Sequence, residues 1–189
     1  MKTIFCIMGA SGSGKSTIVK TVSKALEIPT IITTTSRPPR ENEVDGIDYH
    51  FKSEDYFKDE SKFCEIITYD TVFGKWYYGV EKESIEAVDK AGIIIVTPQG
   101  YSQLKAAMPN VNFVPIYIHV PEIVRIERLV DRGDSMNEVK RRAIADEKDF
   151  KNVLDLMPVV LYNRDLDVCS GNLFMEINSH LTYIDLIGE

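Results

Sequence analysis

Gly9-Ala10-Ser11-Gly12-Ser13-Gly14-Lys15-Ser16 matches the pattern G-x-x-x-x-G-K-[ST] of a phosphate-binding loop. Glycines let successive backbone N–H groups point into one concavity, and an anion is favoured where that concavity opens a helix. Lys15 can reach the β- and γ-phosphates of a nucleoside triphosphate, and the Ser16 hydroxyl can ligate Mg²⁺. Residues 2–8, an apolar run, precede the loop, and residues 16–26 follow it with apolar side chains at helical spacing. The stretch therefore predicts a strand, a phosphate loop and a helix in succession.

The rest of the chain largely continues this alternation of strands and helices. Further strands are predicted at 31–35, 92–97, 113–120 and 159–162, and helices at 81–90, 101–108, 121–133, 135–155 and 172–187. Ser135 and Glu138 have the spacing of a capping box, which marks the start of one of these helices. Strands that alternate with helices predict an α/β fold with a parallel core sheet flanked by helices on both faces.

Residues 33–80 depart from that alternation. The segment 36–46 is polar and contains paired prolines, which exclude a helix there. A short helix is predicted after Ser53, and two strands are predicted at 63–69 and 71–78. This region is therefore expected to form a mixed α/β insertion outside the main sheet.

Length and composition indicate a single soluble domain. The chain has 189 residues and a formal net charge of −7, which disfavours nucleic acid and anionic membrane as partners. No apolar run approaches the roughly 20 residues of a membrane span, and the apolar start of the chain is interpreted as a strand rather than a signal peptide. The three cysteines are scattered and predict reduced packing residues in a cytoplasmic protein, and no role is assigned to the three histidines.

The segment Thr34-Thr35-Ser36-Arg37-Pro38-Pro39-Arg40-Glu41-Asn42-Glu43-Val44-Asp45-Gly46-Ile47-Asp48-Tyr49-His50-Phe51 resembles a signature of guanylate kinase, T-T-R-x-P-R-x-G-E-x-x-G-x-D-Y-x-F. Ser36 lies just before Arg37, and Asn42 replaces a glycine. The resemblance runs nearly end to end and implies the fold of P-loop nucleoside monophosphate kinases. It implies a core of 1–32, 81–124 and 143–189, a monophosphate-binding insertion of 33–80, and a short helical lid of 125–142.

The same resemblance implies an ATP-dependent kinase that phosphorylates a nucleoside monophosphate, with GMP or dGMP as the expected acceptor and Mg²⁺ as cofactor. The chain is expected to act as a monomer or homodimer. Its ATP-binding residues by resemblance are Gly9, Ser11, Gly12, Ser13, Gly14, Lys15, Ser16, Thr17 and Asn163, with Ser16 on the metal. Arg132 and Arg142 correspond to the arginines of the mobile lid and, with Lys15 and Arg37, are the expected catalytic residues. Arg125 and Arg141 are expected on the basic face of an amphipathic helix.

The acceptor phosphate is expected to bind Arg37, Arg40, Tyr49 and Tyr78, because guanidinium groups and phenols suit phosphate oxygens. Glu65 corresponds to the family's guanine-recognising glutamate. A carboxylate has only hydrogen-bond acceptors, which suit the N1–H and the exocyclic amine of guanine. Adenine has no such pair of donors on that edge.

Three further expected acceptor-site residues differ from those of the family. Thr33 replaces a serine and keeps a hydroxyl, Val80 replaces a serine or threonine, and Thr97 replaces an aspartate. Ile95 also replaces an acidic residue, and about three residues are added between Glu65 and Tyr77. These departures reduce the polar partners available to the base and to Mg²⁺, at a cost of about 1–3 kcal/mol for each lost partner of a buried group.

Two alternatives follow from these departures. The superfamily includes a ribose bisphosphate kinase with Tyr-Tyr-Gly-Val, and Val80 and Thr97 fit that acceptor or another monophosphate, whereas Asp48-Tyr49 and Glu65 favour a guanine nucleotide. Guanylate-kinase-like domains of scaffold proteins bind partners without catalysis. The intact Lys15-Ser16 argues against a non-catalytic binding module.

Overall fold

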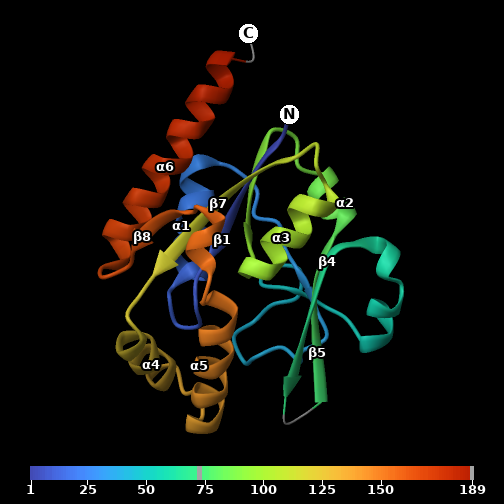
Figure 1. The fold of residues 1–189 in the computed structure, drawn as a ribbon, viewed down its shortest axis with the longest axis vertical. Coiled ribbons are helices and arrows are strands. Elements are labelled where there is room, and N and C mark those ends of the chain that lie inside the picture. The colour runs from blue at the N-terminus through green and yellow to red at the C-terminus, as the bar shows by residue number, and fades with distance from the viewer. Residues whose placement is uncertain (72–73, 188–189) are drawn as a thin grey trace.

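The computed structural model describes residues 1–71 and 74–187 and contains a central parallel sheet (Figure 1). Its strand order is β6 (Ala91–Ile95), β1 (Thr3–Met8), β7 (Asn112–His119) and β8 (Val159–Tyr162), and every neighbouring pair is parallel. The predicted α/β fold with a parallel core sheet is therefore confirmed. All six residues of β1 are buried, as expected for an inner strand covered on both faces.

Helices cover both faces of this sheet, and β1 divides its side chains between them. Phe5 and Ile7 pack with α1 (Lys15–Leu26) and α6 (Leu166–Ile187), which lie side by side on one face. Ile4, Cys6 and Met8 pack with α3 (Pro98–Ala107) on the other face. These two apolar layers hold β1 in place and therefore fix the position at which the phosphate loop begins.

A second sheet lies beside the first and is formed by strands from the region between residues 34 and 81. Its order is β3 (His50–Phe51), β2 (Thr34–Thr35), β5 (Gly74–Glu81) and β4 (Phe63–Thr71). The strands β4 and β5 form a long antiparallel hairpin, which extends down one side of the molecule in Figure 1. Two 3₁₀ turns, Glu54–Lys58 and Glu60–Lys62, precede the hairpin, and α2 (Lys82–Glu86) follows it.

Two helices, α4 (Glu122–Asp131) and α5 (Met136–Phe150), connect β7 with β8. The turn between them uses Gly133, whose φ of 91° suits glycine. Ser135 caps α5 by accepting a hydrogen bond from Glu138 N–H at 3.3 Å, as the capping box predicts. A 3₁₀ turn, Val153–Leu156, follows the helix.

Several predicted boundaries differ from the structure. The predicted helix at 101–108 begins earlier, at Pro98, because Thr97 caps it by accepting a hydrogen bond from Gly100 N–H at 3.0 Å. The helix predicted at 172–187 likewise begins at Leu166, and Asp165 accepts a hydrogen bond from Val168 N–H at 2.9 Å. These caps start both helices ahead of the positions that the apolar spacing predicts.

Other elements are shorter than predicted. The strand predicted at 31–35 contains only Thr34–Thr35, which belongs to the second sheet, while Ile31 N–H donates to Ile93 O of the first sheet at 2.8 Å. The helices predicted at 81–90 and 135–155 end at Glu86 and Phe150. The strand predicted at 71–78 is described from Gly74 onward, and positions 72–73 lie outside the described residues.

The three cysteines are free and buried, in agreement with their predicted packing role. In the part of the chain that the structure describes, no helix has the length and apolar character that crossing a membrane requires.

Candidate active site

The phosphate loop follows β1 and has two backbone positions that favour glycine. Gly12 and Gly14 have φ values of 78° and 83°, in the left-handed region that other residues rarely adopt. A Cβ atom at Gly12 would lie 2.7 Å from Arg125 O, and one at Gly14 would lie 2.7 Å from Asn163 Nδ2. These close approaches explain the glycines of the motif and give the loop the concave backbone that a polyanion requires.

The Lys15 ammonium group lies over this loop. Its Nζ atom donates to the carbonyl oxygen of Gly9, to Ala10 O at 3.1 Å and to Ser13 Oγ at 3.3 Å. Burial lowers the pKa of Lys15 to about 8, and the carboxylate of Asp146 opposes this effect. A phosphate group in place of the neutral acceptors would favour the charged ammonium.

Two side chains from other elements donate hydrogen bonds to carbonyl oxygens of the loop. Asn163, which is buried and follows β8, donates from Nδ2 to Ser13 O at 2.8 Å. Its Oδ1 atom is buried and has no hydrogen-bond partner among the described residues. Arg128 of α4 donates to Gly12 O and Asn163 O, both at 3.4 Å. Asn163, a predicted ATP-binding residue, thus supports the loop backbone, and Arg128 was not assigned a role from the sequence.

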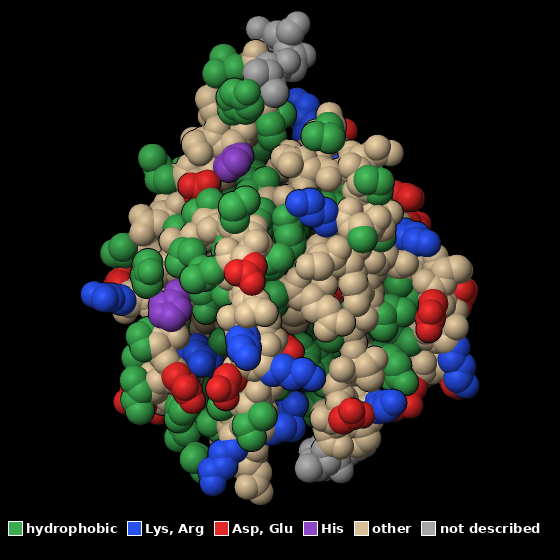
Figure 2. Space-filling view, in the orientation of Figure 1, with side chains coloured by type: hydrophobic (Ala, Val, Ile, Leu, Met, Phe, Trp, Pro, Cys, Tyr) green, Lys and Arg blue, Asp and Glu red, His purple; other side chains and the backbone are tan. Residues whose placement is uncertain are grey.

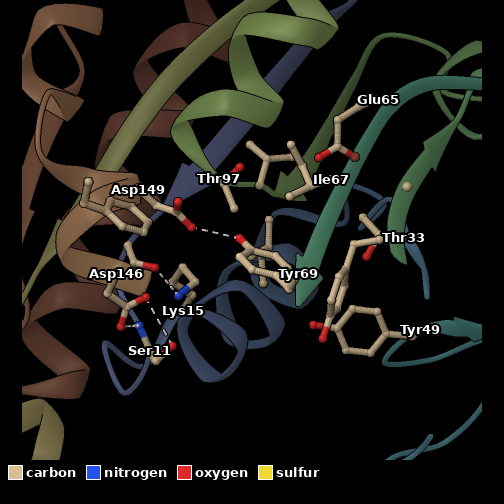
Figure 3. Close-up of a pocket in the computed structure, with 16 residues that line it drawn as sticks. Ser11, Lys15, Thr33, Tyr49, Glu65, Ile67, Tyr69, Thr97, Asp146 and Asp149 are labelled. Carbon is tan, nitrogen blue, oxygen red and sulfur yellow. Dashed lines mark hydrogen bonds between the residues drawn. The ribbon is translucent and has the colours of Figure 1, made fainter. Parts of the chain in front are cut away.

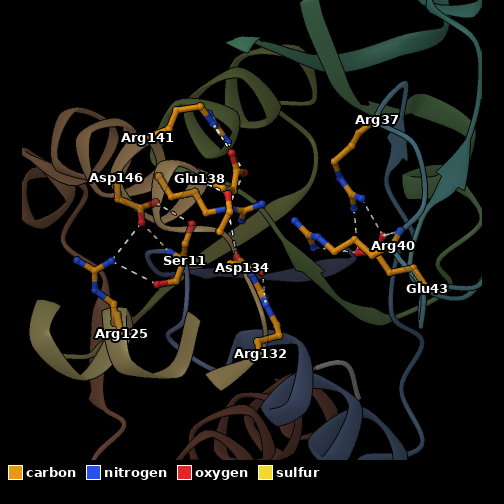
Figure 4. A network of polar contacts seen from close by, with 12 residues as sticks. Ser11, Arg37, Arg40, Glu43, Arg125, Arg132, Asp134, Glu138, Arg141 and Asp146 are labelled. Atoms are coloured by element: carbon orange, nitrogen blue, oxygen red, sulfur yellow. Dashed lines mark hydrogen bonds and ion pairs between the residues drawn. The ribbon is translucent and has the colours of Figure 1, made fainter. Parts of the chain in front are cut away.

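Asp146 of α5 contacts the loop at Ser11, and the sequence did not predict this contact. It accepts hydrogen bonds from Ser11 N–H at 2.9 Å and Ser11 Oγ at 3.3 Å. Arg125 of α4 pairs with the same carboxylate at 3.1 Å and also donates to Ser11 O at 3.3 Å (Figure 4). Arg125, expected on the basic face of an amphipathic helix, is thus paired with an acid of α5, and its side chain is only 12% exposed.

Ser16 and Thr17 occupy the first turn of α1 and are exposed. The Ser16 side chain borders a cleft of about 500 Å³ between α1 and the loop that carries Tyr49. In the part of the chain that the structure describes, no group of three or more His, Cys, Asp or Glu side chains could hold a metal ion. An accessible hydroxyl beside the phosphate loop suits a Mg²⁺ ion whose other ligands are phosphate oxygens and water.

Across from the loop, Arg37 and Arg40 share one carboxylate. Glu43 pairs with Arg37 at 2.8 Å and with Arg40 at 3.0 Å, and it also accepts from the Arg40 backbone N–H at 2.8 Å (Figure 4). Burial raises the pKa of Glu43, but the hydrogen bonds from the arginines outweigh it and the net shift is downward. The structure thus brings together the two predicted phosphate-binding arginines and adds Glu43, which sequence analysis did not single out.

Aromatic side chains complete this cluster. Arg37 donates from Nε to Tyr78 Oη at 3.2 Å, and its guanidinium carbon lies 5.3 Å from the centre of the Tyr49 ring. The Tyr49 and Tyr78 rings contact each other edge to face at 6.1 Å. The buried Arg37 is therefore oriented by a carboxylate and two phenols, as a fixed phosphate-binding fork requires.

The two predicted lid arginines also have acidic partners. Arg132 donates from Nε to Asp134 Oδ1 at 3.1 Å, and Arg142 pairs with Glu138 at 2.8 Å. Arg141 shares Glu138 at 2.8 Å and is half-buried. Hydrogen bonds from Arg141, with further help from Arg142, lower the pKa of Glu138 to about 2. Figure 2 shows basic and acidic side chains intermingled over this region.

A cavity of about 180 Å³ joins the two halves of the site (Figure 3). The phosphate-loop end is lined by Gly9, Ser11 and Lys15, and the opposite end is lined by Thr33, Tyr49, Glu65, Ile67, Tyr69, Tyr78, Gly79, Ile95 and Thr97. The cavity therefore places the predicted donor loop and most of the predicted acceptor residues around one space. Its wall near Glu65 is largely apolar.

Glu65 is the most perturbed acid of this cavity. Its side chain is 6% exposed, and burial raises its pKa to about 8 because a backbone N–H of Val80 offsets only part of the lost hydration. A Cβ atom added to Gly100 would lie 2.5 Å from Glu65 Oε1. Gly100, in the first turn of α3, therefore provides the space in which the carboxyl group lies.

The structure does not bring Val80 to the cavity. Its side chain is fully buried in the core with Ile94 and Val96, and Gly79 lines the cavity instead. Thr97 borders the cavity, but its hydroxyl is already engaged as the cap of α3. Thr33 lines the wall near Tyr49. Of the three departures from the expected pattern, only Thr33 and Thr97 face the acceptor space.

A contact between α5 and the hairpin crosses the site. Tyr69 of β4 donates its hydroxyl to Asp149 Oδ2 at 3.0 Å (Figure 3). Trp76, opposite Tyr69 in the hairpin, borders a smaller cavity of about 140 Å³ together with Arg141, Arg142 and Asp146. The lengthened hairpin thus reaches the helix that carries Arg142, one of the predicted lid arginines, a contact that residue spacing did not predict.

Comparison with known proteins gives a consistent result. The family model of guanylate kinase matches residues 1–178. Guanylate kinase from Neisseria gonorrhoeae is 33% identical over 181 residues, which cover 93% of this chain and 87% of the relative. Guanylate kinase from Helicobacter pylori is 34% identical over 171 residues, covering 87% and 81%. The crystal structure of guanylate kinase from Anaplasma phagocytophilum shares the fold with a TM-score of 0.67 at 19% identity, covering 95% of this chain and 86% of that one.

Glu65 provides a test of the site's electrostatics in the ligand-free protein. We expect its carboxyl group to titrate near pH 8 when followed by ¹³C NMR, whereas Glu138 titrates near pH 2 in the same experiment. Because the folded state binds this proton more tightly than the unfolded chain, the contribution of Glu65 to folding stability is greatest at low pH. It is lost as the pH rises from 4.5 to about 8. Glu65→Gln should remove this loss, and a Glu65 midpoint near 4.5 would contradict the assigned environment.

Proposed function

The chain belongs to the guanylate kinase family, and on this basis we propose that it transfers the γ-phosphoryl group of ATP to the 5′-phosphate of GMP or dGMP. The observation that carries the proposal is the single cavity lined by Lys15 and the phosphate loop at one end and by Tyr49, Tyr78 and Glu65 at the other. Such an arrangement lets two phosphorylated ligands meet with their phosphates facing each other. The products would be ADP and GDP or dGDP.

Catalysis in this scheme consists of positioning and charge neutralisation. Lys15 and the backbone of the phosphate loop bind the donor phosphates, and Arg37 with Arg40 holds the acceptor phosphate. Arg132 and Arg142 turn from their acidic partners toward the transferring group when the lid closes. No covalent enzyme intermediate is required, because the acceptor phosphate oxygen attacks the γ-phosphorus directly.

Mg²⁺ is the proposed cofactor and would neutralise the charge that develops on the ATP phosphates during transfer. Ser16 is the protein residue best suited to hold it, since its hydroxyl is exposed in the turn that follows Lys15. Among the described residues, no group of three or more His, Cys, Asp or Glu side chains could hold a metal ion, which fits an ion that arrives already bound to the triphosphate.

Recognition of the acceptor base is assigned to Glu65. Its carboxylate can accept hydrogen bonds from the N1–H and the exocyclic amine of guanine, and the surrounding apolar wall of Ile67 and Ile95 suits the faces of a purine. We also propose that the enzyme works in the cytoplasm in purine nucleotide metabolism, which the three free cysteines support.

The acceptor is tested with a coupled assay for ADP formation in the presence of MgATP. The panel contains GMP, dGMP, AMP, UMP and ribose 1,5-bisphosphate. We expect the highest kcat/KM for GMP or dGMP, and we expect Glu65→Gln to lower it by about ten- to a hundredfold, since a hydrogen bond to a charged group contributes about 1.5–3 kcal/mol. Faster turnover of the bisphosphate or of AMP would contradict the proposed acceptor.

The role of Lys15 is tested with Lys15→Ala. We expect kcat to fall at least about a hundredfold, the scale of losing one transition-state charge partner. The thermal midpoint should change little, because Lys15 contacts only loop carbonyls and a hydroxyl. Lys20→Ala, at an exposed position of the same helix, is the matched control and should retain activity. Normal turnover by Lys15→Ala would refute the assignment.

The geometry of the base site is tested with Gly100→Ala. The added methyl group would lie 2.5 Å from Glu65 Oε1, so the carboxyl group must shift. We expect the KM for GMP to rise about tenfold or more, while the KM for MgATP stays unchanged, because the shift disturbs only the base contact. Gly171→Ala, where a methyl group meets nothing within 4 Å, is the matched control. Equal GMP affinity in both variants would show that Gly100 does not position Glu65.

A further inference from the structure

One carboxylate lies where the proposed donor anion has to bind. Asp146, on α5, faces the phosphate loop and accepts hydrogen bonds from Ser11 N–H at 2.9 Å and Ser11 Oγ at 3.3 Å. Arg125 pairs with the same carboxylate at 3.1 Å, and both side chains are 12% exposed. The contact is therefore a nearly buried, charged interaction between α5, α4 and the phosphate loop, and Asp146 and Ser11 are 135 positions apart in the chain.

The donors that surround Asp146 are those that a phosphate group would use. They are a loop N–H, a serine hydroxyl and a guanidinium group, with the ammonium of Lys15 close enough for the Asp146 carboxylate to stabilise its charged form. Charge-assisted hydrogen bonds of these types bind phosphate and carboxylate alike. A triphosphate that enters the loop brings several negative charges to a place that already holds one.

We propose that Asp146 lowers the affinity of the donor site for a triphosphate. Its carboxylate is an internal anion that is bound at Ser11 of the phosphate loop and is displaced when the triphosphate binds. The inference rests on the proposed donor role of the loop. Electrostatic repulsion between the bound phosphates and an undisplaced carboxylate would weaken donor binding, so binding has to move the carboxylate, or the helix that carries it, away from Ser11.

The position of Asp146 on α5 links this displacement to the acceptor side. Asp149, one turn along the same helix, accepts the hydroxyl hydrogen bond of Tyr69 from the second sheet at 3.0 Å. Arg142, one turn in the other direction, is a proposed lid arginine and pairs with Glu138. Movement of α5 away from the loop therefore changes the positions of a lid arginine and of a contact with the acceptor-binding sheet in one step.

The test measures anion binding by calorimetry, with sodium tripolyphosphate as the probe and the full chain in every sample. We expect Asp146→Asn to bind the probe about tenfold more tightly than the wild-type chain, because the variant keeps the shape of the side chain and removes its charge. Glu147→Gln is the matched control, since Glu147 is the exposed neighbour on the same helix and its replacement changes the net charge equally. Its affinity should equal that of the wild-type chain.

The sign of the effect separates this inference from a structural role. If Asp146 only braced the loop, its removal would weaken binding, so an affinity that is unchanged or lower in Asp146→Asn overturns the inference. Asp146→Ala is a second variant with the same expectation. Binding of the probe that persists in Lys15→Ala would instead overturn the proposed donor role of the loop, so the two failures are distinguishable.

Trp76 offers an independent readout because it is the only tryptophan of the sequence and borders the same small cavity as Asp146. We expect tripolyphosphate to change its fluorescence in the wild-type chain, with a midpoint that moves about tenfold lower in Asp146→Asn, as the calorimetric affinity does. A midpoint that is identical in both proteins would contradict the proposed displacement.

Discussion

The active site depends on the backbone turn between β1 and α1. The strand is buried along its whole length between two parallel neighbours. The position of its carboxyl end, where the phosphate loop begins, is therefore fixed at one edge of the sheet. Ligands of open parallel sheets bind at the carboxyl ends of the strands, and this edge also receives Thr97 after β6 and Asn163 after β8. The glycines turn the chain sharply there, and Asn163 fixes the turn by binding Ser13 O.

A second constraint is electrostatic. A chain with a net charge of −7 has to keep several arginines close together in one site. It does so by giving most of them an acidic partner. Arg37 and Arg40 share Glu43, Arg132 pairs with Asp134, and Arg125 pairs with Asp146, while Glu138 holds both Arg141 and Arg142. Phosphates that enter the site compete with these carboxylates for the same guanidinium groups. Closure of the proposed lid can therefore follow from an exchange of partners, which costs less than exposing unpaired charges in a half-buried space.

The sequence predicted the local parts of this arrangement and missed the long-range ones. The loop, its flanking strand and helix, the parallel sheet and the cap of α5 are encoded over short stretches, and the structure confirms them. Glu43 lies within six positions of Arg37 and Arg40, yet its pairing with both depends on a loop conformation that no spacing rule reports. Asp146 and Tyr69 pair with partners that only tertiary packing brings close. The pairing of Arg125 with Asp146 was missed for the same reason. A helical pattern indicates which face is polar, but it does not indicate which acid lies opposite that face. Val80 was assigned to the acceptor site by position in a motif, whereas the end of β5 enters the core there.

The acceptor end of the cavity has a simpler chemistry than the donor end. Apolar residues surround Glu65, and Val80 and Ile95 contribute no polar group to a base. Because burial keeps the pKa of Glu65 near 8, the carboxyl group is mostly protonated at neutral pH until a ligand supplies two donors. Guanine does so and adenine does not. If Glu65 is the main polar contact to the base, discrimination against adenine rests on hydrogen bonds to one charged group. These contribute about 1.5–3 kcal/mol, or roughly a ten- to 150-fold preference. Selectivity therefore depends on how accurately the fold positions Glu65. Gly100 leaves space for its carboxyl group, and the Thr97 cap fixes the start of α3, which carries Gly100.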